Sequence, residues 1–446
     1  MTSLLPETGR LVDAAVAEGQ ATGMVPSIVL GVVRDGRLVH VATAGGPARA
    51  GEPAPSAAVQ YRIGSISKTL TAALVLQLRD EGRLGLDDLL HRHLPGTPIG
   101  GATLRQLLGH ASGLQREPEG DWWERNPGAD LDTLLAGLTT DKVAFPPHRT
   151  YHYSNLAYGL LGAVVHRVTG EDWPTLLEKR LLGPLGMRAT TYHPVRPYAR
   201  GFVVHPWAGT LREEPRTDTA AMAPAGQLWS TVEDLARWAA FLTDPVPSVL
   251  APDTVDEMCQ PVVISDLESW TAGHGLGLEL YRVGERVYAG HGGSMPGYVA
   301  ALAVHRPSRA GAVALANAYS FRVGGIGALA RSVLTTVAGE PVPARPWRPP
   351  AAPPAHVTTL CGRWWWMGVE YDLAWDADAG EVVMTAIRTD AAVPWRFAPE
   401  AGDRWRGRTG TNAGEVLHVR RDDQGRPVLL DIATCLFTRS PDGGPH

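Results

Sequence analysis

Cysteine is scarce in this chain. Only three occur among its 446 residues, Cys259, Cys361 and Cys435, and an odd, sparse set is typical of a reducing compartment. Cys361 and Cys435 lie in the same final part of the chain, where a disulfide is conceivable. No secretion signal accompanies them, so free thiols are the favoured prediction. None of the three has the spacing of metal ligands.

Signal peptides, membrane spans and blocks of charge are missing as well. The first residues lack a basic start and an apolar run, and no stretch approaches the ~20 apolar residues of a spanning helix. The formal net charge is −5, without a large run of one sign. We therefore expect a cytoplasmic protein that has neither nucleic acid nor a membrane as a partner. Because no pair of histidines has zinc spacing, we expect no metal and no cofactor.

Proline and glycine, in contrast, are abundant, with 36 and 50 residues. Residues 341–354 contain seven of the prolines. So many prolines exclude a helix or a central strand and favour an extended connector. The sequence therefore predicts a large unit over residues 1–340 and a small unit over residues 355–446.

The large unit mixes strand and helix patterns. Two apolar runs, residues 27–34 and 37–43, flank Asp35-Gly36, which is a hairpin signal. Residues 65–81 form an apolar helical pattern, and a second helix is expected from Ser230, with Glu233 completing a capping box. Short strand patterns separated by glycine and proline predict an antiparallel sheet, so the expected class is α/β (α+β). These runs are residues 276–281, 286–289, 298–305 and 312–318.

The small unit has the pattern of an all-β domain. Seven of the 14 tryptophans lie from Trp347 onward, and short apolar runs alternate with Asp/Gly turns. Strands near residues 362–364 and 436–439 are the expected first and last strands of a small, lipocalin-like barrel. Arg439, at the end of the last strand, is a candidate to grip a substrate carboxylate if the barrel docks at a cleft. An ordinary surface arginine is the more frequent outcome at such a position.

The segment Gly64-Ser65-Ile66-Ser67-Lys68 opens the first apolar helix. Residues at positions i and i+3 share a helical face, so Ser65 and Lys68 are expected to touch. A serine hydroxyl needs a base to become a nucleophile, and a buried lysine amine has a lowered pKa that suits this task. Alone the pattern is weak, because a capping serine followed by a surface lysine is common.

Tyr153-Ser154-Asn155 stands at a second loop-to-helix junction. A tyrosine there can project its hydroxyl into a cleft, and a neighbouring lysine ammonium would favour the phenolate as a base. Asn155 offers a donor and an acceptor for orienting Lys68 or a substrate amide. The alternative is a packed tyrosine beside a capping asparagine.

His291-Gly292-Gly293-Ser294 stands between two of the predicted strands. Two glycines allow a ligand to lie against the backbone like an added strand. The N–H of Ser294 can then join that of Ser65 in an oxyanion hole, and His291 can bond the reacting group or a carboxylate. By itself this pattern indicates only a turn.

In this order, the three patterns resemble the Ser-x-x-Lys, Tyr-x-Asn and His-Gly-Gly motifs of serine β-lactamases and penicillin-binding proteins. The class C β-lactamase-like branch, with its esterases and D-amino-acid peptidases, is the most similar. Residues 103–114, 184–187 and 224–231 also resemble signatures of that branch, and the likeness spans roughly residues 10–338. His291 departs from the lysine of true β-lactamases, which argues against efficient β-lactam hydrolysis.

The resemblance implies an antiparallel sheet flanked by helices, with a helical subdomain that holds Tyr153 across the cleft. It implies that Ser65 is acylated, that Lys68 is its base, and that Tyr153 shuttles the proton. Asn155 would position the substrate, and Ser65 and Ser294 would supply the oxyanion N–H groups.

Three functions remain open on this basis. The first is a hydrolase that acts on an ester, an amide or a D-amino-acid peptide through an acyl-enzyme. The second is a stand-alone penicillin-binding-protein-type thioesterase, in which an amine resolves the acyl-enzyme and a nonribosomal peptide is cyclised. Such an enzyme resembles this chain in its catalytic core and small C-terminal barrel, and a peptidyl carrier protein would be its partner. The third is a penicillin-binding sensor that acylates once and stops.

Overall fold

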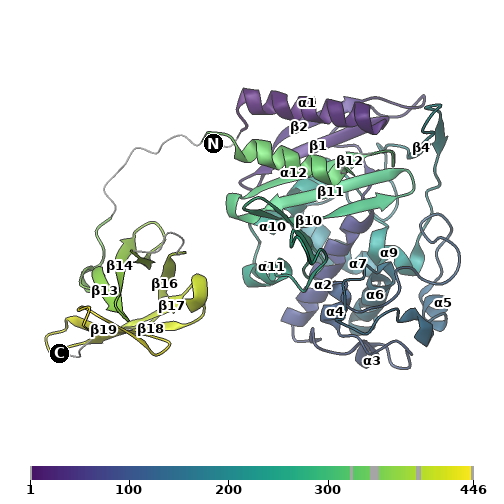
Figure 1. Cartoon of the computed structure of the whole chain (residues 1–446). Coiled ribbons are helices and arrows are strands. Elements are labelled where there is room, and N and C mark those ends of the chain that lie inside the picture. Colours follow the sequence, from purple (N-terminus) through teal and green to yellow (C-terminus); the bar gives the residue numbers. More distant parts are fainter. Residues whose placement is uncertain (1–2, 322–324, 342–350, 388–392, 443–446) are drawn as a thin grey trace. The chain divides into compact units, whose positions relative to one another are not determined.

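Two compact units make up the protein, residues 1–341 and residues 342–446. A computed structural model describes residues 3–321, 325–341, 351–387 and 393–442 (Figure 1). Most of the predicted connector, residues 342–350, lies outside the described residues. No helix within the described ranges combines the length and the hydropathy that crossing a bilayer requires.

An eight-stranded sheet forms the centre of the first unit, in the order β2-β1-β12-β11-β10-β9-β8-β7. The register between neighbouring strands is antiparallel throughout, as the sequence predicts. Asp35 and Gly36, both with positive φ, form the turn of the predicted first hairpin. The strands are β1 (Ser27–Arg34), β2 (Arg37–Gly45), β7 (Val263–Ile264), β8 (Ala272–His274), β9 (Glu279–Val283), β10 (Arg286–Met295), β11 (Tyr298–His305) and β12 (Ala310–Ala316).

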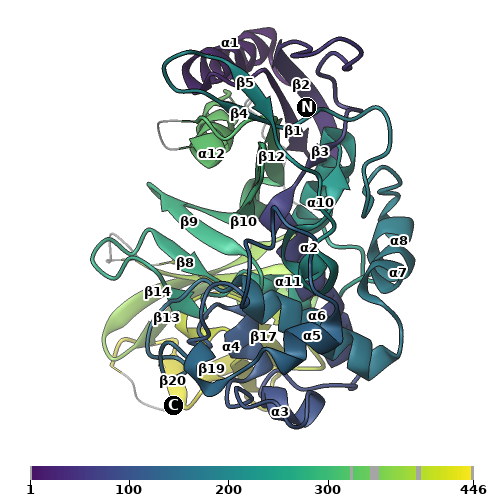
Figure 2. The ribbon, with the colours of Figure 1, turned by 90° about the vertical axis from the view of Figure 1, so that its right-hand side faces the viewer.

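Alternation along β1 divides the apolar core into two layers. Ile28, Leu30 and Val32 pack with the buried faces of α1 (Pro6–Gly23) and α12 (Gly325–Ala338). Val29 and Val33 point to the other face, where they join the core that contains α2 (Ser67–Asp80) and α10 (Val232–Thr243). Period-two alternation thus lets a single strand fill both layers. Figures 1 and 2 both show α1 and α12 side by side against this sheet.

A helical subdomain occupies much of the chain between β2 and β7, and Figure 2 shows several of its helices gathered away from α1 and α12. Its innermost members are α2, which is buried over most of its length, and α6 (Asn155–Thr169), which is buried from Asn155 to Val165; neither has a polar face there. The remaining helices of the unit are α2 (Ser67–Asp80), α3 (Leu90–His93), α4 (Leu104–Leu108), α5 (Leu131–Ala136), α6 (Asn155–Thr169), α7 (Trp173–Leu177), α8 (Gly183–Leu185), α9 (Ala223–Gly226), α10 (Val232–Thr243) and α11 (Pro252–Met258). Two small ladders, β3 (Tyr61–Arg62) with β6 (Trp229–Ser230) and β4 (Phe202–Val204) with β5 (Leu211–Glu213), complete it.

The expected capping box of the helix after residue 230 is wrong by one residue. Ser230 belongs to β6, where its hydroxyl bonds that of Thr190 at 2.7 Å. Thr231 is the N-cap instead, and its hydroxyl accepts the N–H of Asp234. Adjacent Ser and Thr are both good caps, so the neighbouring strand decides which one is used.

The second unit is a closed antiparallel barrel of eight strands, which confirms the predicted all-β barrel. It closes where Trp365 pairs with Thr438, so the predicted first and last strands are the ones that meet. All three cysteines are free, so Cys361 and Cys435 form no disulfide. The strands are β13 (Gly362–Trp366), β14 (Val369–Asp376), β15 (Glu381–Ala386), β16 (Trp395–Pro399), β17 (Arg404–Gly407), β18 (Val416–Arg421), β19 (Pro427–Ile432) and β20 (Cys435–Thr438), and a short helix, α13 (Ala355–Thr358), precedes them.

Candidate active site

Ser65 lies in a 3-10 turn (Gly64–Ile66) that leads directly into α2. It is half-buried, whereas its neighbours on both sides are buried, so its hydroxyl is where this turn meets solvent. The turn places Lys68 one helical turn later on the same face. The local sequence therefore fixes a hydroxyl and an amine together at the beginning of a buried helix.

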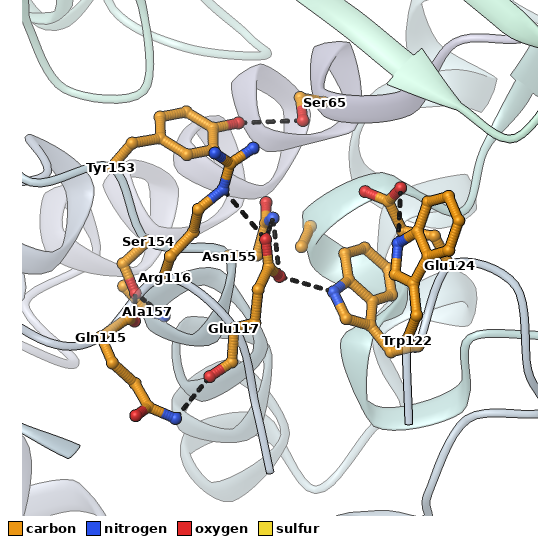
Figure 3. A network of polar contacts seen from close by, with 12 residues as sticks. Ser65, Gln115, Arg116, Glu117, Trp122, Glu124, Tyr153, Ser154, Asn155 and Ala157 are labelled. Carbon is orange, nitrogen blue, oxygen red and sulfur yellow. Dashed lines mark hydrogen bonds and ion pairs between the residues drawn. The ribbon is translucent and has the colours of Figure 1, made fainter. Parts of the chain in front are cut away.

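The structure brings the Ser65 hydroxyl together with the amine of the adjoining helix and with a phenol from a distant loop. Lys68 Nζ lies 2.8 Å from Ser65 Oγ and also donates to the carbonyl of Ala225 at 2.7 Å. The Tyr153 hydroxyl donates to Ser65 Oγ at 2.9 Å. Figure 3 shows this Tyr153–Ser65 contact above the rest of the polar network. One oxygen atom is thus within hydrogen-bonding distance of both groups that can move its proton.

Burial sets the protonation of the two partners. It lowers the pKa of the Lys68 ammonium from 10.5 to about 7, although the carboxylates of Glu124 and Glu117 oppose this shift. Burial also raises the pKa of the Tyr153 phenol well above 10, although its bond to Ser65 opposes the change. The expectation that Lys68 favours the phenolate is therefore not met. Near neutral pH the phenol keeps its proton, while a large part of the lysine is the free amine.

Contacts on both sides of Tyr153 hold its loop. The N–H of His152 donates to the carbonyl of His110 at 2.9 Å, and the N–H of Ser154 donates to His110 Nδ1 at 3.1 Å. Ser154, rather than the asparagine, caps α6, because its hydroxyl accepts the N–H of Ala157. The ring of His110 packs against that of Tyr153, with centroids 4.2 Å apart. The backbone carbonyl and the ring of His110 therefore together hold the Tyr153 loop and its phenol in place.

Asn155 occupies the first turn of α6 and faces a carboxylate. Its Nδ2 donates to both oxygens of Glu117, at 2.9 and 3.0 Å. Glu117 also accepts from the indole N–H of Trp123 at 2.7 Å, so the carboxylate is held from two sides. Figure 3 shows Glu117 directly beside Asn155. Asn155 Oδ1 is buried and has no hydrogen-bond partner among the described residues. The amide is thus oriented by its nitrogen, and its oxygen remains available.

Close backbone contact sets the geometry on the strand side. The His-Gly-Gly pattern lies inside β10, not in a turn between strands as the sequence suggested. A Cβ on Gly293 would meet the carbonyl of Ile63 at 2.0 Å, and one on Gly64 would meet Ser294 N at 2.5 Å. Gly64 also has a positive φ of 51°. Only glycine permits this approach at either position.

Near Ser65, the edge of β10 that faces β9 is no longer paired with that strand. Pairing with β9 ends at Gly290–Glu279, whereas pairing with β11 continues to Met295. The N–H of Gly292 points away from β11, since it donates to Glu279 Oε2 at 2.9 Å. By strand alternation the N–H of Ser294 points to the same side, toward Gly64. It is therefore suitably directed to bond a group held at Ser65.

A cleft of about 520 Å³ opens over these groups. The cleft is lined by three charged side chains, those of Arg116, Glu124 and Glu279. It is also lined by two aromatic residues, Tyr319 and Phe321. The pKa of Glu279 lies below its usual value: burial acts to raise it, but His291, His274 and the Gly292 N–H outweigh this effect. The predicted site residues that line the cleft are Ser65, Tyr153, Asn155, His291, Gly292, Gly293 and Ser294.

His291 is buried, and among the described residues no carboxylate lies within hydrogen-bonding distance of its ring. Its Nδ1 lies 2.5 Å from the carbonyl of Gly292 and 3.8 Å from Glu279 Oε1. Burial lowers the pKa of its imidazole, although Glu279 opposes the shift. The ring is therefore neutral near pH 7, unlike the lysine that true β-lactamases carry at this place.

Arg439 lies in the second unit, where its guanidinium is fully engaged. It donates to four backbone carbonyls at 2.6–3.3 Å and stacks on Trp364 with its Cζ 3.8 Å from the ring centroid. Its contact with a substrate carboxylate stays a prediction.

Sequence reasoning missed Glu117, Glu279 and His274. They carry no local motif, and only the fold brings them near Ser65.

Comparison with known proteins identifies the class. The sequence profile of the β-lactamase family matches residues 12–333. The chain therefore belongs to the β-lactamase and penicillin-binding-protein family, in its class C-like branch, and has a fold of the serine-hydrolase type. A second profile, for a domain of unknown function (DUF7586), matches residues 353–439.

Individual relatives agree with this assignment. Penicillin-binding protein 4 of Amycolatopsis lactamdurans is 30% identical over 76% of this chain and 92% of its own length. Beta-lactamase-like protein 2 of Dictyostelium discoideum is 28% identical over 67% of this chain, which spans only 57% of that relative. D-alanyl-D-alanine-carboxypeptidase/endopeptidase AmpH of Escherichia coli is 31% identical over 40% of this chain, which spans 47% of that relative.

Two solved structures extend the comparison. SurE is 26% identical and covers 97% of this chain and 99% of its own, with a TM-score of 0.61; it has also been solved with D-Leu. A D-stereospecific amidohydrolase from Streptomyces sp. is 28% identical over 70% of this chain and 94% of its own, with a TM-score of 0.59. SurE thus matches both units, whereas the amidohydrolase spans a smaller share of this chain.

Proposed function

We propose that the protein is an active-site serine acyltransferase that forms an acyl-enzyme on Ser65 from an ester, an amide or a D-amino-acid peptide. A single observation carries the proposal: Ser65 Oγ lies 2.8 Å from Lys68 Nζ and 2.9 Å from the Tyr153 hydroxyl. The amine has a pKa of about 7, so it can accept the proton of the serine hydroxyl near neutral pH. Membership of the β-lactamase family supports the same chemistry.

In the first step, Ser65 Oγ attacks the carbonyl carbon of the substrate and its proton passes to the free amine of Lys68. The carbonyl oxygen becomes an oxyanion, which the N–H groups of Ser65 and Ser294 would stabilise. The carbon–leaving-group bond then breaks, and the protonated Tyr153 donates a proton to the leaving group. Lys68 returns the proton to Tyr153, so the acyl-enzyme forms with both groups ready for the second step.

The substrate class follows from two observations. The names of related proteins refer to D-stereospecific amide hydrolysis and to D-Leu. The cleft lies along an unpaired edge of β10 beside two glycines, where a peptide can bind as an added strand. We therefore propose a D-amino-acid ester, amide or peptide as the acyl donor.

Labelling with a serine-directed fluorophosphonate tests the proposal. The wild-type protein should be labelled once, and Ser65→Ala should abolish the label. Ser67→Ala is the matched control, because Ser67 begins α2 only two residues after Ser65, but its hydroxyl accepts the N–H of Leu228 inside the core. Undiminished labelling of Ser65→Ala would overturn the proposal.

A second candidate is peptide cyclisation, in which an amine of the bound peptide replaces water in the second step. The observation that favours it is a closed barrel that follows the catalytic unit in the sequence, since the likeness to SurE extends over 97% of this chain. The acyl donor would then be a peptidyl thioester, delivered by a peptidyl carrier protein or a small thiol.

Product masses separate the two outcomes. Incubation with a peptidyl thioester of D-configuration at the acyl residue should release the thiol in both cases. Cyclisation gives a product without added water, whereas hydrolysis gives the linear acid, 18 mass units heavier by the mass of one water. A single burst of thiol without turnover would contradict both and would favour a penicillin-binding sensor.

A further inference from the structure

Three histidines from distant parts of the chain meet behind the ring of Tyr153. His274 ends β8, His291 lies in β10, and His110 follows α4, and all three are buried. The ring centroids of His110 and His274 are 4.5 Å apart, and those of His274 and His291 are 5.8 Å apart. His110 also contacts the Tyr153 ring directly. The cluster therefore joins the loop that carries the phenol to the strand that carries Ser294.

Backbone groups fix the Nδ1 atom of each ring. His110 Nδ1 accepts the N–H of Ser154, so in the neutral ring the proton must be on Nε2. His274 Nδ1 faces the carbonyl of Gly275 at 3.1 Å, and His291 Nδ1 faces that of Gly292. Because a carbonyl can only accept, these two rings carry the proton on Nδ1 and present a lone pair at Nε2.

The three Nε2 atoms are the polar atoms that remain. All three are buried and have no hydrogen-bond partner among the described residues. The cluster thus presents one N–H donor, from His110, and two acceptors, from His274 and His291. One nitrogen atom from each ring lies within 4.8 Å of the others. Leaving a buried polar atom without a hydrogen bond costs free energy. Three such nitrogen atoms in one place therefore favour a single bound partner that bonds all of them.

The rings are neutral near pH 7, so this pattern of one donor and two acceptors holds there. Burial lowers the pKa of His274 to about 4, and the nearby His291 adds to the effect. Burial likewise lowers the pKa values of His110 and His291.

We propose that His110, His274 and His291 bind one buried water molecule, and that this site positions Tyr153 and β10 for the reaction at Ser65. A water molecule donates two hydrogen bonds and can accept up to two, so it can satisfy the one N–H and the two lone pairs together. Three nitrogen atoms around a water oxygen at about 2.9 Å can be up to about 5.0 Å apart, which accommodates this cluster. His274 is thereby a positioning residue, since it acts through the water and not on the substrate. The functional part of this inference rests on the proposed acylation of Ser65.

A zinc ion is the competing occupant and fits less well. Zinc would need three lone pairs, at nitrogen atoms about 3.4 Å apart for Zn–N distances of about 2.1 Å. His110 has no lone pair at Nε2 while its Nδ1 accepts the N–H of Ser154. A ligating histidine normally donates from its other nitrogen, as His274 and His291 do but His110 does not.

Two substitutions of His274 test the positioning role. His274→Phe keeps a ring of similar size but removes the acceptor, so the water loses one bond and Tyr153 its indirect link to β8. His274→Gln keeps an acceptor oxygen. The rate constant of Ser65 acylation by a D-amino-acid p-nitrophenyl ester should fall about tenfold in His274→Phe with little change in KM, and His274→Gln should recover most of it. His305→Phe, a half-exposed histidine at the end of β11, is the matched control and should keep the wild-type rate.

A crystal structure of the wild-type protein at high resolution tests the water itself. It should show one ordered oxygen within hydrogen-bonding distance of all three Nε2 atoms. Hydrogen bonds directly between the Nε2 atoms with no ordered oxygen among them, or density for a metal with stoichiometric zinc in the purified protein, would overturn the site. An unchanged acylation rate in a folded His274→Phe would overturn the positioning role. If the wild-type protein acylates no ester at all, the proposed function fails, and the crystal structure still decides whether the water is bound.

Discussion

The two units differ in whether their buried polar side-chain atoms have hydrogen-bond partners. Within the described residues, every buried side-chain nitrogen or oxygen atom without a hydrogen-bond partner belongs to the first unit. In the barrel, Trp364 donates its indole N–H to the carbonyl of Leu360, and Arg439 uses its guanidinium on backbone carbonyls. The unpaired atoms near Ser65 belong to His110, Asn155, His274 and His291. The other five of the nine unpaired atoms among the described residues belong to Glu52, Arg62, Gln77 and Thr97. Because unpaired buried polarity is costly, the four atoms around Tyr153 and Asn155 mark groups that remain available to a bound molecule.

The largest effect on the reaction is expected when the buried amine of Lys68 is removed. Lys68→Met should lower Ser65 acylation by about 1,000-fold or more. Within the described part of the chain, the hydroxyl has only Lys68 and the protonated Tyr153 as side-chain hydrogen-bond partners, so the variant has no base in place. It should also raise the thermal midpoint, since a desolvated amine is replaced by an apolar chain. Single-turnover acylation and thermal unfolding measure the two effects. Lys142→Met, which removes a lysine bonded to Glu119, is the control for acylation; a similar loss in both variants would contradict a specific role.

A smaller loss of acylation rate is expected from substitutions of the glycines in β10. Gly293→Ala places a methyl group against the carbonyl of Ile63, so β10 must move away from the Ser65 turn. The acylation rate should fall about 100-fold through misplacement of the oxyanion N–H groups. Gly292→Ala should cost much less, because its methyl group meets only Glu279 Oε2 at 3.7 Å. Equal losses in the two variants would argue against the close contact.

The carboxylate beside Asn155 offers a milder test. Glu117→Gln keeps the shape but removes the charge that holds Asn155 Nδ2. We expect kcat/KM to fall by about tenfold, since charge-assisted bonds are roughly twice as strong as neutral ones. Glu119→Gln, at an exposed carboxylate nearby in the sequence, should have no effect. A fully active Glu117→Gln would show that Asn155 needs no anchor.

The smallest effect on chemistry is expected in the barrel. Arg439→Ala should lower the stability of the barrel by about 2 kcal/mol, through lost hydrogen bonds and stacking on Trp364. Labelling of Ser65 by a small fluorophosphonate should be unchanged. A loss of activity confined to substrates with a free carboxylate would instead support the substrate contact of Arg439.

Much of the fold and the central contact could be predicted from the sequence. Local pattern sufficed for the first hairpin, for α2 and for the closure of the barrel, because period and turn residues determine these features. The extent of β10 was missed, since glycines conceal a strand that pairing with β11 stabilises. The state of Tyr153 depends on burial, which no motif reports. His274 and Glu279 carry no local signal, because only the sheet brings them to the site.

The pH dependence of Ser65 acylation tests the central claim most directly. Only the free amine of Lys68 can accept the proton, so the single-turnover rate should rise with pH and level off, with a midpoint near the Lys68 pKa of about 7. It should then stay level to about pH 9, because the Tyr153 phenol keeps its proton over this range. A midpoint near 10, the ordinary value for lysine, or a rate that falls between pH 6 and pH 9 would contradict the account.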